Sequence, residues 1–577
     1  MVDGEGPHPS RPGGLTHESI AVGAQPVVQS FLDRIGLRAL FDDALGKPDP
    51  RIRLSYVDSA LLLVRNFALS RHPLYGVAEW ARRFSPERLE LSAAQLALLN
   101  DDRLGRTLDR LFILDRRTLV TRFVLRVVEV FGLELGRLHN DSTSITFSGV
   151  YHPRPARRDG RRRLAIVHGY NKDHRPDLKQ LVWTLTIAAD GGVPVHYNVD
   201  DGNVTDDRTH VATWKILRAL SGRPDFLYVA DSKLCTRENM GFIHGEGGLF
   251  VTVLPRTRRE DDQFRQRLAE QTVDWQLLWE RPPPRRKHDP PERFEAVADT
   301  ATAEGYRLIW FRSSEKWKRD EQWRQNAVDR ARFELHRLRD RVGRRKLKTQ
   351  AQVQSAVETI LDETKARPWL VVELTRSERH RHKQAGRGRP GPNTRYLRVT
   401  TTVYEPVVTV DAEAVRRSAA TDGIFPLVTN AAVERLSTLE VLQTYKYQAF
   451  IEKRHEQLKT AAEIVPVNFK SVERIEAFLF LYFLAITLHA LIERQVRRAM
   501  AARRLPSIPL YPEERECRAP TADKILQVFE PLRKYHLRRN ARLVQTFADP
   551  LSDIQATVLD LLGIPASVYA PTRPDPA

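Results

Sequence analysis

The sequence predicts an α/β protein in which helices flank a mixed sheet. Two period-two segments, Leu181–Ala189 and Val193–Val199, are separated by Asp190-Gly191-Gly192, a strong hairpin signal. A helical stretch at 207–220 follows, and then a short apolar run at 225–230 of the kind found in buried strands. Antiparallel strands followed by a helix and a buried strand are typical of a mixed sheet with helices on its faces.

Composition indicates a polyanionic partner. The 577 residues include 92 Lys and Arg against 73 Asp and Glu, which gives a net charge of +19. This excess favours nucleic acid over an anionic membrane surface. Only two cysteines occur, Cys235 and Cys517, so a disulfide framework and a Cys-based zinc site are excluded and a reducing, cytoplasmic location is expected.

No segment reads as a membrane span or a signal peptide. The most apolar stretch, Ala477–Ile492, is shorter than the 18 or so residues that a spanning helix needs, and we interpret it as a buried core helix. The N-terminus lacks a basic segment followed by an apolar run. We therefore expect no membrane partner.

The N-terminal region divides into a tail and a helical domain. Residues 1–24 are rich in Gly, Pro and Ser, which predicts disorder. Residues 25–132 are helical in pattern, as the three-to-four spacing of Val28, Phe31 and Ile35 illustrates. A small helical domain of this kind can bind DNA, although no helix-turn-helix signature identifies a recognition helix.

The rest of the chain is expected to interrupt one catalytic core with an insertion. Residues 133–254 form the first part of the core, beginning with a strand at Leu138–Phe147. Residues 255–421 form a β-containing insertion subdomain, residues 422–500 the second part of the core, and residues 501–577 a helical region with a tail. Within the insertion we expect, in order, a linker (282–293), an Arg-rich helix (315–348), a basic loop (376–392) and a strand (396–410).

One helix, Tyr445–Lys459, carries a polar stripe. At about 100° per residue, five polar side chains fall within roughly 80° of the helix surface. They are Tyr445, Gln448, Glu452, Glu456 and Lys459. Phe450, Ile451 and Leu458 lie on the other side, where they can anchor the helix in a core. An amphipathic surface helix with ion pairs is the alternative interpretation.

Three acids are candidates for a shared metal site. Asp141 lies within a strand pattern, where a carboxylate is disfavoured by propensity. Asp231 ends a short apolar strand, where an acid can instead cap the following helix. Together with Glu452 on its late helix, these side chains can converge at the end of a sheet. Three carboxylates suit two Mg²⁺ ions, with Mn²⁺ as an alternative, in phosphodiester chemistry.

At these residues the sequence resembles the bacterial DDE transposases of the insertion-sequence-four superfamily. Tyr445, Gln448, Glu452 and Lys459 match the signature Y-x2-R-x3-E-x6-K, with Gln448 in place of the arginine. Four further stretches resemble the branch with a long β-rich insertion: NDST (140–143), HGYNKDHRPDLKQ (168–180), DGNVTDD (201–207) and ADSK (230–233). The resemblance extends from about residue 20 to residue 562.

The resemblance implies an RNase H-like core with Asp141, Asp231 and Glu452 as its acidic triad. It implies a DNA transposase that cleaves the ends of an insertion sequence and joins the 3′-hydroxyl to target DNA. Double-stranded DNA is then the partner, as element ends and as target, and we expect a homodimer in the DNA complex and association with the nucleoid. Tyr445 and Lys459 would contact phosphate; Gln448 can donate a hydrogen bond there but carries no charge.

Several basic residues are further DNA-binding candidates. They are Lys172, His174, Arg175 and Lys179. The alternative is a solvated basic loop. Glu456 is the rival to Glu452 as third acid. Two other functions stay open: a nuclease of the same fold without strand transfer, and a catalytically inactive descendant that binds DNA.

Overall fold

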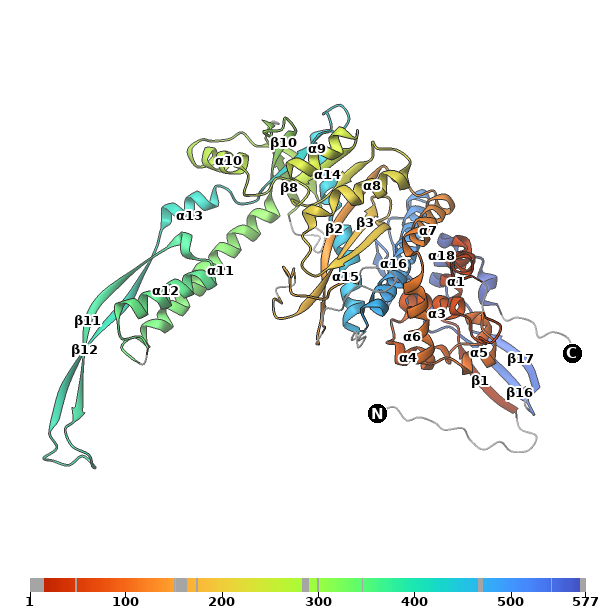
Figure 1. Ribbon diagram of the computed structural model, residues 1–577, viewed down its shortest axis with the longest axis horizontal. Helices are drawn as coiled ribbons and strands as arrows, with labels where there is room; N and C mark the ends of the chain where they lie inside the picture. The colour runs from red at the N-terminus through yellow and green to blue at the C-terminus, as the bar shows by residue number, and fades with distance from the viewer. Residues whose placement is uncertain are drawn as a thin grey trace. The chain divides into compact units, whose positions relative to one another are not determined.

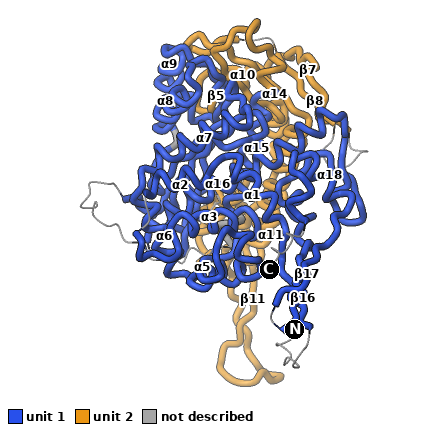
Figure 2. The backbone as a smooth tube through the Cα atoms, turned by 90° about the vertical axis from the view of Figure 1, so that its right-hand side faces the viewer, with its two compact units in different colours: residues 1–252, 443–577 blue, residues 253–442 orange. Residues whose placement is uncertain are grey.

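The chain forms two compact units (Figure 2), Met1–Thr252 with Gln443–Ala577 and, between them in sequence, Val253–Leu442. The second unit continues past residue 421, where we expected the insertion to end. It therefore includes the strand at Ile424–Thr429, which we expected in the second part of the core. The computed structural model describes residues 15–46, 49–149, 151, 163–172, 175–282, 290–297, 300–344, 346–464, 471–540 and 542–570.

The mixed α/β class is confirmed. In the first unit, β2, β3 and β4 form an antiparallel meander, β5 pairs in parallel with β2, and β6 pairs in parallel with β5, giving the order β4-β3-β2-β5-β6. The strands are β2 (Arg137–Phe147), β3 (Lys179–Ala188), β4 (Val193–Asp201), β5 (Leu227–Val229) and β6 (Leu249–Val253). Gly191 and Gly192 both have positive φ in the predicted β3–β4 turn, which explains why glycine occupies both positions.

Residues 25–131 are helical, as predicted. The helices are α1 (Gln25–Ile35), α2 (Leu37–Leu45), α3 (Tyr56–Leu69), α4 (Leu74–Ala81), α5 (Ala93–Ala97), α6 (Asp101–Ile113) and α7 (Arg116–Phe131). The long helix α16 (Val472–Ala502) packs against α3 and α6 and against strand β4 (Figure 1). By length and composition α16 passes as a membrane span, but 94% of its apolar window is buried by protein, which confirms the predicted core helix.

Two faces of the sheet carry different helices. Helices α8 (His210–Ser221) and α9 (Arg237–Gly245) follow β4 and β5 in sequence, and His210 lies 3.0 Å from the Tyr228 hydroxyl. In the parallel register His139 pairs with Val229, one residue from Tyr228, and therefore lies on the other face. That second face is covered by α15 (Ala449–Ile464), which packs on β2 and β3.

The helix predicted at Tyr445–Lys459 is in fact two helices. Helix α14 (Thr438–Lys446) ends just before Tyr447, and α15 starts at Ala449. Backbone bonds of the tighter i→i−3 kind carry the chain through the junction, including Gln448 N–H to the Tyr445 carbonyl at 3.0 Å. The prediction of one continuous helix was therefore wrong, because residues 447 and 448 form a turn between the two helices.

Strands at the two ends of the chain overturn two further predictions. Within the tail predicted to be disordered, Leu15–Ala21 forms β1, while residues 1–14 lie outside the described residues. β1 pairs with β16 (Arg533–Arg539), which pairs in turn with β17 (Arg542–Ala548). The C-terminal region is thus not simply helical: it also holds β14 (Ile508–Tyr511) and β15 (Arg515–Cys517) besides α17 (Ala522–Gln527) and α18 (Asp553–Leu562).

The second unit contains a short sheet, helices and a long ribbon. Its strands and helices are α10 (Arg259–Glu270), β7 (Gln276–Arg281), β8 (Glu292–Ala296), β9 (Thr300–Ala301), β10 (Arg307–Ser313), α11 (Ser314–Arg339), α12 (Gln350–Thr364), β11 (Leu370–Gln384), β12 (Tyr396–Val410), α13 (Ala412–Ala419) and β13 (Ile424–Thr429). The basic loop expected at 376–392 is largely strand, because β11 runs to Gln384 and pairs with β12 along its whole length. The predicted linker at 282–293 joins β7 to β8, and residues 283–289 lie outside the described residues.

Candidate active site

Asp141 lies in the middle of β2, on the face of the sheet covered by α15. It is two residues from His139 and therefore points to the same face. From α15, His455 brings its Nε2 to 3.6 Å from Asp141 Oδ2. The aliphatic pattern of β2 is interrupted here by a run of polar residues that are buried or half-buried and therefore need polar partners.

Asp231 follows β5, the strand beside β2. Its Oδ1 accepts the backbone N–H of Lys233 at 3.0 Å, so the side chain is held in the turn after the strand. The alternative role, capping the next helix, is filled by Thr236, whose side chain accepts the Asn239 N–H at the start of α9. Thr236, and not Asp231, therefore caps α9.

Glu452 lies in the first turn of α15, and the opposite side of this helix is fixed by buried contacts. Ile451 and Leu458 are buried, as expected. Arg454 donates to the Gly192 carbonyl at 3.1 Å and forms a buried ion pair of 2.8 Å with Glu493 of α16. These contacts hold α15 against the β3–β4 turn and α16, so the position of Glu452 over the sheet follows from packing on its opposite side.

The charge of Asp141 raises the pKa of both other acids. Burial and then the charge of Asp141 raise the pKa of Asp231. The same two causes raise the pKa of Glu452. Glu452 is exposed, but nearby protein atoms still remove part of its hydration shell. Asp141 is thus the central member of the group.

Tyr445 of α14 completes this environment. Burial, followed by the charges of Asp231, Asp141 and Glu452, raises its pKa to about 12. All three carboxylates therefore act on one phenol. Since the phenol keeps its proton throughout the neutral range, it is a hydrogen-bond donor next to the acids.

A lysine ammonium lies against Asp141. Lys172 Nζ is 3.5 Å from Asp141 Oδ1 and donates to the Ser142 carbonyl and hydroxyl at 2.6 and 2.9 Å. We predicted a DNA-backbone contact for Lys172. Any such contact stays a prediction, but the ammonium is directed at the acidic group, where its charge offsets part of the rise in the pKa of Asp231.

The described residues do not form a ready-made metal site. Among them, no three His, Cys, Asp or Glu side chains are close enough to share one ion as they stand. The donor chemistry nonetheless suits Mg²⁺, since all three candidate ligands are carboxylates and their mutual repulsion calls for a cation. Lys172 and His455 supply cationic or polar neighbours to Asp141 in this arrangement.

Gln448 connects the helix junction to the sheet. Its Nε2 donates to the Asn140 carbonyl at 3.1 Å, and its Oε1 lies 3.1 Å from His139 Nδ1. Because burial lowers the pKa of His139 to about 4, the imidazole is neutral and donates from Nδ1 to Gln448. The predicted phosphate contact of Gln448 is untested, and its amide would have to leave these partners to make one.

The other predicted DNA-binding residues lie in varied surroundings. Lys459 is half-buried on α15, two turns after Glu452. Arg175 is exposed and forms a two-point ion pair with Asp177 at 2.8 and 2.7 Å. Lys179 donates to the Tyr151 carbonyl at 2.7 Å. His174 lies outside the described residues.

Our sequence reasoning missed two histidines of this site. His455 is three residues after Glu452 and thus on the same helix face, a spacing that would have identified it. His139 is two residues before Asp141 on the same strand face, and alternation along the strand would have identified it.

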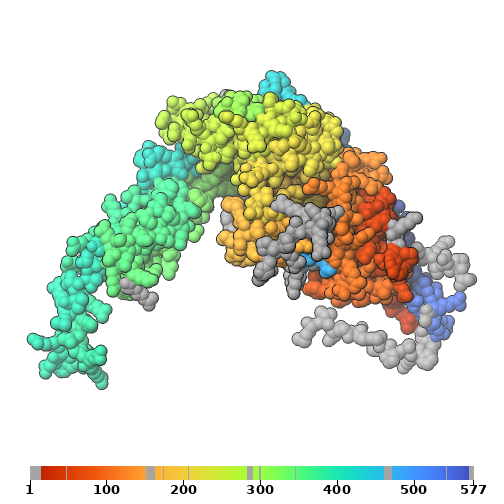
Figure 3. Space-filling model, in the orientation of Figure 1, coloured from red at the N-terminus to blue at the C-terminus, as the bar shows by residue number. Residues whose placement is uncertain are grey.

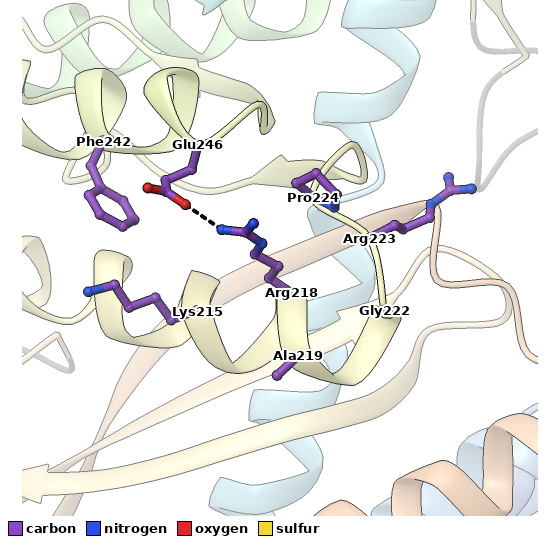
Figure 4. A pocket seen from close by; sticks show the side chains of 8 residues that line it. All are labelled: Lys215, Arg218, Ala219, Gly222, Arg223, Pro224, Phe242 and Glu246. Atoms are coloured by element: carbon purple, nitrogen blue, oxygen red, sulfur yellow. Dashed lines mark hydrogen bonds and ion pairs between the residues drawn. The ribbon is translucent and has the colours of Figure 1, made fainter.

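A separate surface hollow of about 640 Å³ is formed by α8 and α9, on the Tyr228 side of the sheet (Figure 4). Its cations already have partners: Arg218 pairs with Glu246, and Lys215 lies 4.8 Å from the centre of the Phe242 ring. Figure 4 shows the Arg218–Glu246 pair across the hollow. Because it lies on the other face from Asp141, we do not connect this hollow with the acids.

Comparison with known proteins bears on the N-terminal part alone. Residues 18–125 match a family described as "Domain of unknown function (DUF4277)". No curated protein matches the chain. The matched region contains the last four residues of β1 and most of the helical domain and ends before the strand of Asp141, so it assigns no chemistry to the acidic site.

Proposed function

We propose that the protein is a DNA transposase that cleaves the ends of an insertion sequence and joins the resulting 3′-hydroxyl to target DNA. The observation that supports the proposal is that Asp141 lies on β2, Asp231 follows the neighbouring strand β5, and Glu452 lies on α15, which packs on β2; the charge of Asp141 raises the pKa of both other acids. The sheet order β4-β3-β2-β5-β6 is compatible with the RNase H-like core that the resemblance implies.

In this proposal Asp141, Asp231 and Glu452 hold divalent cations. Bound Mg²⁺ or Mn²⁺ would supply the charge that activates a water or a 3′-hydroxyl and stabilises the leaving oxygen of the phosphodiester. Cleavage forms a bond from the water oxygen to phosphorus and breaks the bond to the 3′ oxygen. In joining, the 3′-hydroxyl oxygen attacks a target phosphodiester and displaces that strand's 3′ oxygen.

The chain's own residues orient the substrate. Tyr445 keeps its proton at neutral pH and can donate it in a hydrogen bond to a phosphate oxygen beside the acids. Lys172 balances the charge of Asp141 and of Asp231 until a cation is bound. The net charge of +19 supports affinity for DNA through phosphate contacts.

A second candidate function, DNA binding without catalysis, has one observation in its favour. Within the described ranges the acids are not arranged to share an ion, and Asp141 already has Lys172 and His455 beside it. Such a protein would bind DNA with the same cationic surfaces but would leave phosphodiester bonds intact.

One experiment separates these functions. A duplex carrying the DNA that flanks the gene is incubated with the protein and Mg²⁺, and nicks and joined products are resolved on a denaturing gel. The proposal predicts 3′-hydroxyl nicks and strand-transfer products that disappear when the metal is chelated. Nicks without joining would indicate a nuclease, and retardation of DNA without nicks would indicate the inactive alternative.

A further inference from the structure

The outer half of the β11–β12 ribbon is cationic and exposed on both faces. At its base the ribbon packs through Leu370 and Val403 on a hydrophobic cluster with α11 and α12. Beyond that cluster, residues 378–402 form what we call the arm, which extends past α11 and α12 (Figures 1 and 3). Nearly every residue of the arm's two strands is exposed.

The charge of the arm indicates what covers it. One acid, Glu378, stands against seven Arg and Lys side chains, of which Arg379 is paired with Glu405 at the base of the arm: Arg379, Arg381, Lys383, Arg387, Arg389, Arg395 and Arg398. A two-stranded ribbon with no helix or sheet on its faces is marginally stable in water, so a partner is expected. Two copies of so cationic an arm would repel each other, whereas a polyanion is attracted.

The tip of the arm is shaped for close approach. Gly388 has a φ of +134°, which side chains disfavour, and no atom beyond its two chain neighbours lies within 4 Å of the position a Cβ would take. The glycine is therefore required by the backbone and not by packing within the protein. Gln384 Nε2 donates to the Gly388 carbonyl at 3.1 Å and holds this conformation. Arg387 and Arg389 flank the bare glycine and are exposed.

A bare backbone between two arginines matches one surface of duplex DNA. The minor groove is only about 6 Å wide, which admits an extended backbone more readily than a helix or a ribbon. In A·T-rich DNA this groove is narrower and more negative, and it attracts arginine. In G·C-rich DNA the guanine amino group projects from the groove floor and obstructs a closely lying backbone.

We propose that Arg387, Gly388 and Arg389 lie in the minor groove of A·T-rich duplex DNA, with the cations of the two strands along the neighbouring phosphates. This deepens the proposed function, on which it rests for the class of partner, by naming the kind of DNA sequence that the protein prefers. This contact selects A·T-rich DNA because its minor groove is narrower and lacks the guanine amino group.

The test measures binding of the full-length protein to three duplexes of equal length, composed of A·T, G·C or inosine·C pairs. Inosine·C lacks the guanine amino group in the minor groove but keeps the major-groove pattern of G·C. The proposal predicts that A·T and inosine·C bind alike and that G·C binds about tenfold more weakly. Equal binding of all three, or inosine·C behaving like G·C, overturns it.

Variants assign the preference to the tip. Arg387→Gln/Arg389→Gln and the charge-neutral Gly388→Val are both expected to abolish the preference. The matched control is Arg337→Gln/Arg416→Gln, because these two exposed arginines of the same unit are ion-paired with Glu334 and Glu413. The control should keep the preference. The proposal is overturned if Gly388→Val still prefers A·T and inosine·C over G·C duplexes. It is also overturned if the wild-type protein self-associates and the tip variants remove this self-association.

The outcome is distinguishable from that of the proposed function. Glu452→Gln removes a candidate metal ligand and should leave the A·T preference intact. A wild-type protein that shows the preference but never cleaves DNA refutes the transposase proposal alone. A protein that cleaves but binds the three duplexes equally refutes the tip proposal alone. Since the inosine·C comparison needs no variant, it does not depend on the folding of Gly388→Val.

Discussion

Replacing Arg454 by methionine tests how the acidic site is held in place. The ion pair of Arg454 with Glu493 joins α15 to α16, and both side chains are almost fully buried, at 4% and 6% exposure. Removing one partner of a buried pair costs about 3–5 kcal/mol, because the other charge is left without compensation. Glu493 keeps the Ala522 N–H at 3.0 Å and the partly exposed Arg497 at 3.5 Å, so we expect the lower end, about 3 kcal/mol.

The assay is amide hydrogen exchange followed peptide by peptide. A loss of about 3 kcal/mol corresponds to exchange roughly a hundredfold faster in the described parts of α15 and α16. Peptides of β11 and β12 serve as an internal reference and should be unchanged. Arg337→Met is the matched control, because its ion pair with Glu334 is exposed and such pairs contribute about 0.5 kcal/mol or less.

A double variant isolates the role of charge. In Arg454→Met/Glu493→Gln no buried charge remains, while the Gln oxygen can still accept the Ala522 N–H. Most of the lost protection should therefore return. The reasoning is refuted if Arg454→Met exchanges like Arg337→Met. If the double variant is as unprotected as the single one, the hydrogen bond to Gly192 and not the charge holds α15.

Three further predictions follow from neighbouring contacts. Burial raises the pKa of Glu493, but its partners, chiefly Arg454, outweigh burial and lower the pKa below the ordinary glutamate value. The ionised Glu493 therefore stabilises the fold above the ordinary glutamate pKa, and this stabilisation is lost as pH falls through the lowered pKa. Hydrogen-exchange protection of α16 that is unchanged on acidification would contradict this. Gln448→Ala leaves the Asn140 carbonyl and His139 Nδ1 without their partner and should lower the free energy of unfolding by about 1–3 kcal/mol. Amide exchange across the α14–α15 junction should become faster. Unchanged exchange would show that the Gln448 amide does not stabilise the junction. Lys172→Met removes the ammonium that competes with a metal ion for Asp141, so titration calorimetry should show tighter Mn²⁺ binding. Weaker Mn²⁺ binding would contradict this competition and would mean that Lys172 supports the site in another way.

The parts of the fold set by local patterns were predictable from the sequence. Alternation identified β3 and β4, and two glycines identified their turn. Strands that depend on distant partners were not: β1 pairs Leu15 with Arg539, at the other end of the chain, and short polar strands carry no signal of such a partner. The β12 side of the arm was predicted as a strand, but its β11 side was predicted as a loop, because that strand is polar and lacks a buried face.

In the candidate site, too, features set by local sequence were predictable and features that depend on distant contacts were not. Asp141, Asp231 and Glu452 could be proposed from the sequence because each is a local feature, as an acid within a strand, after a strand or on a helix stripe, and because the resemblance implies them as a triad. The break between α14 and α15 was not, because Lys446 to Ala449 contain neither Gly nor Pro and the turn is instead held by Gln448 against β2. The ammonium of Lys172 beside Asp141 comes from a loop 31 positions away, which no local pattern indicates.

The central claim, that Glu452 acts with Asp141 and Asp231 on phosphodiester bonds, is tested most directly by comparing Glu452→Gln with Glu456→Gln. Both changes remove one negative charge from α15 with little change of shape, and the two positions are one helical turn apart. The measurement is metal-dependent nicking and joining of the gene's flanking DNA, with gel retardation as the control for binding. We predict that Glu452→Gln loses both reactions, that Glu456→Gln largely keeps them, and that both retain DNA binding with a similar salt dependence. Loss of cleavage in Glu456→Gln with activity in Glu452→Gln would contradict the assignment of the third acid, and full activity in both would contradict the mechanism itself.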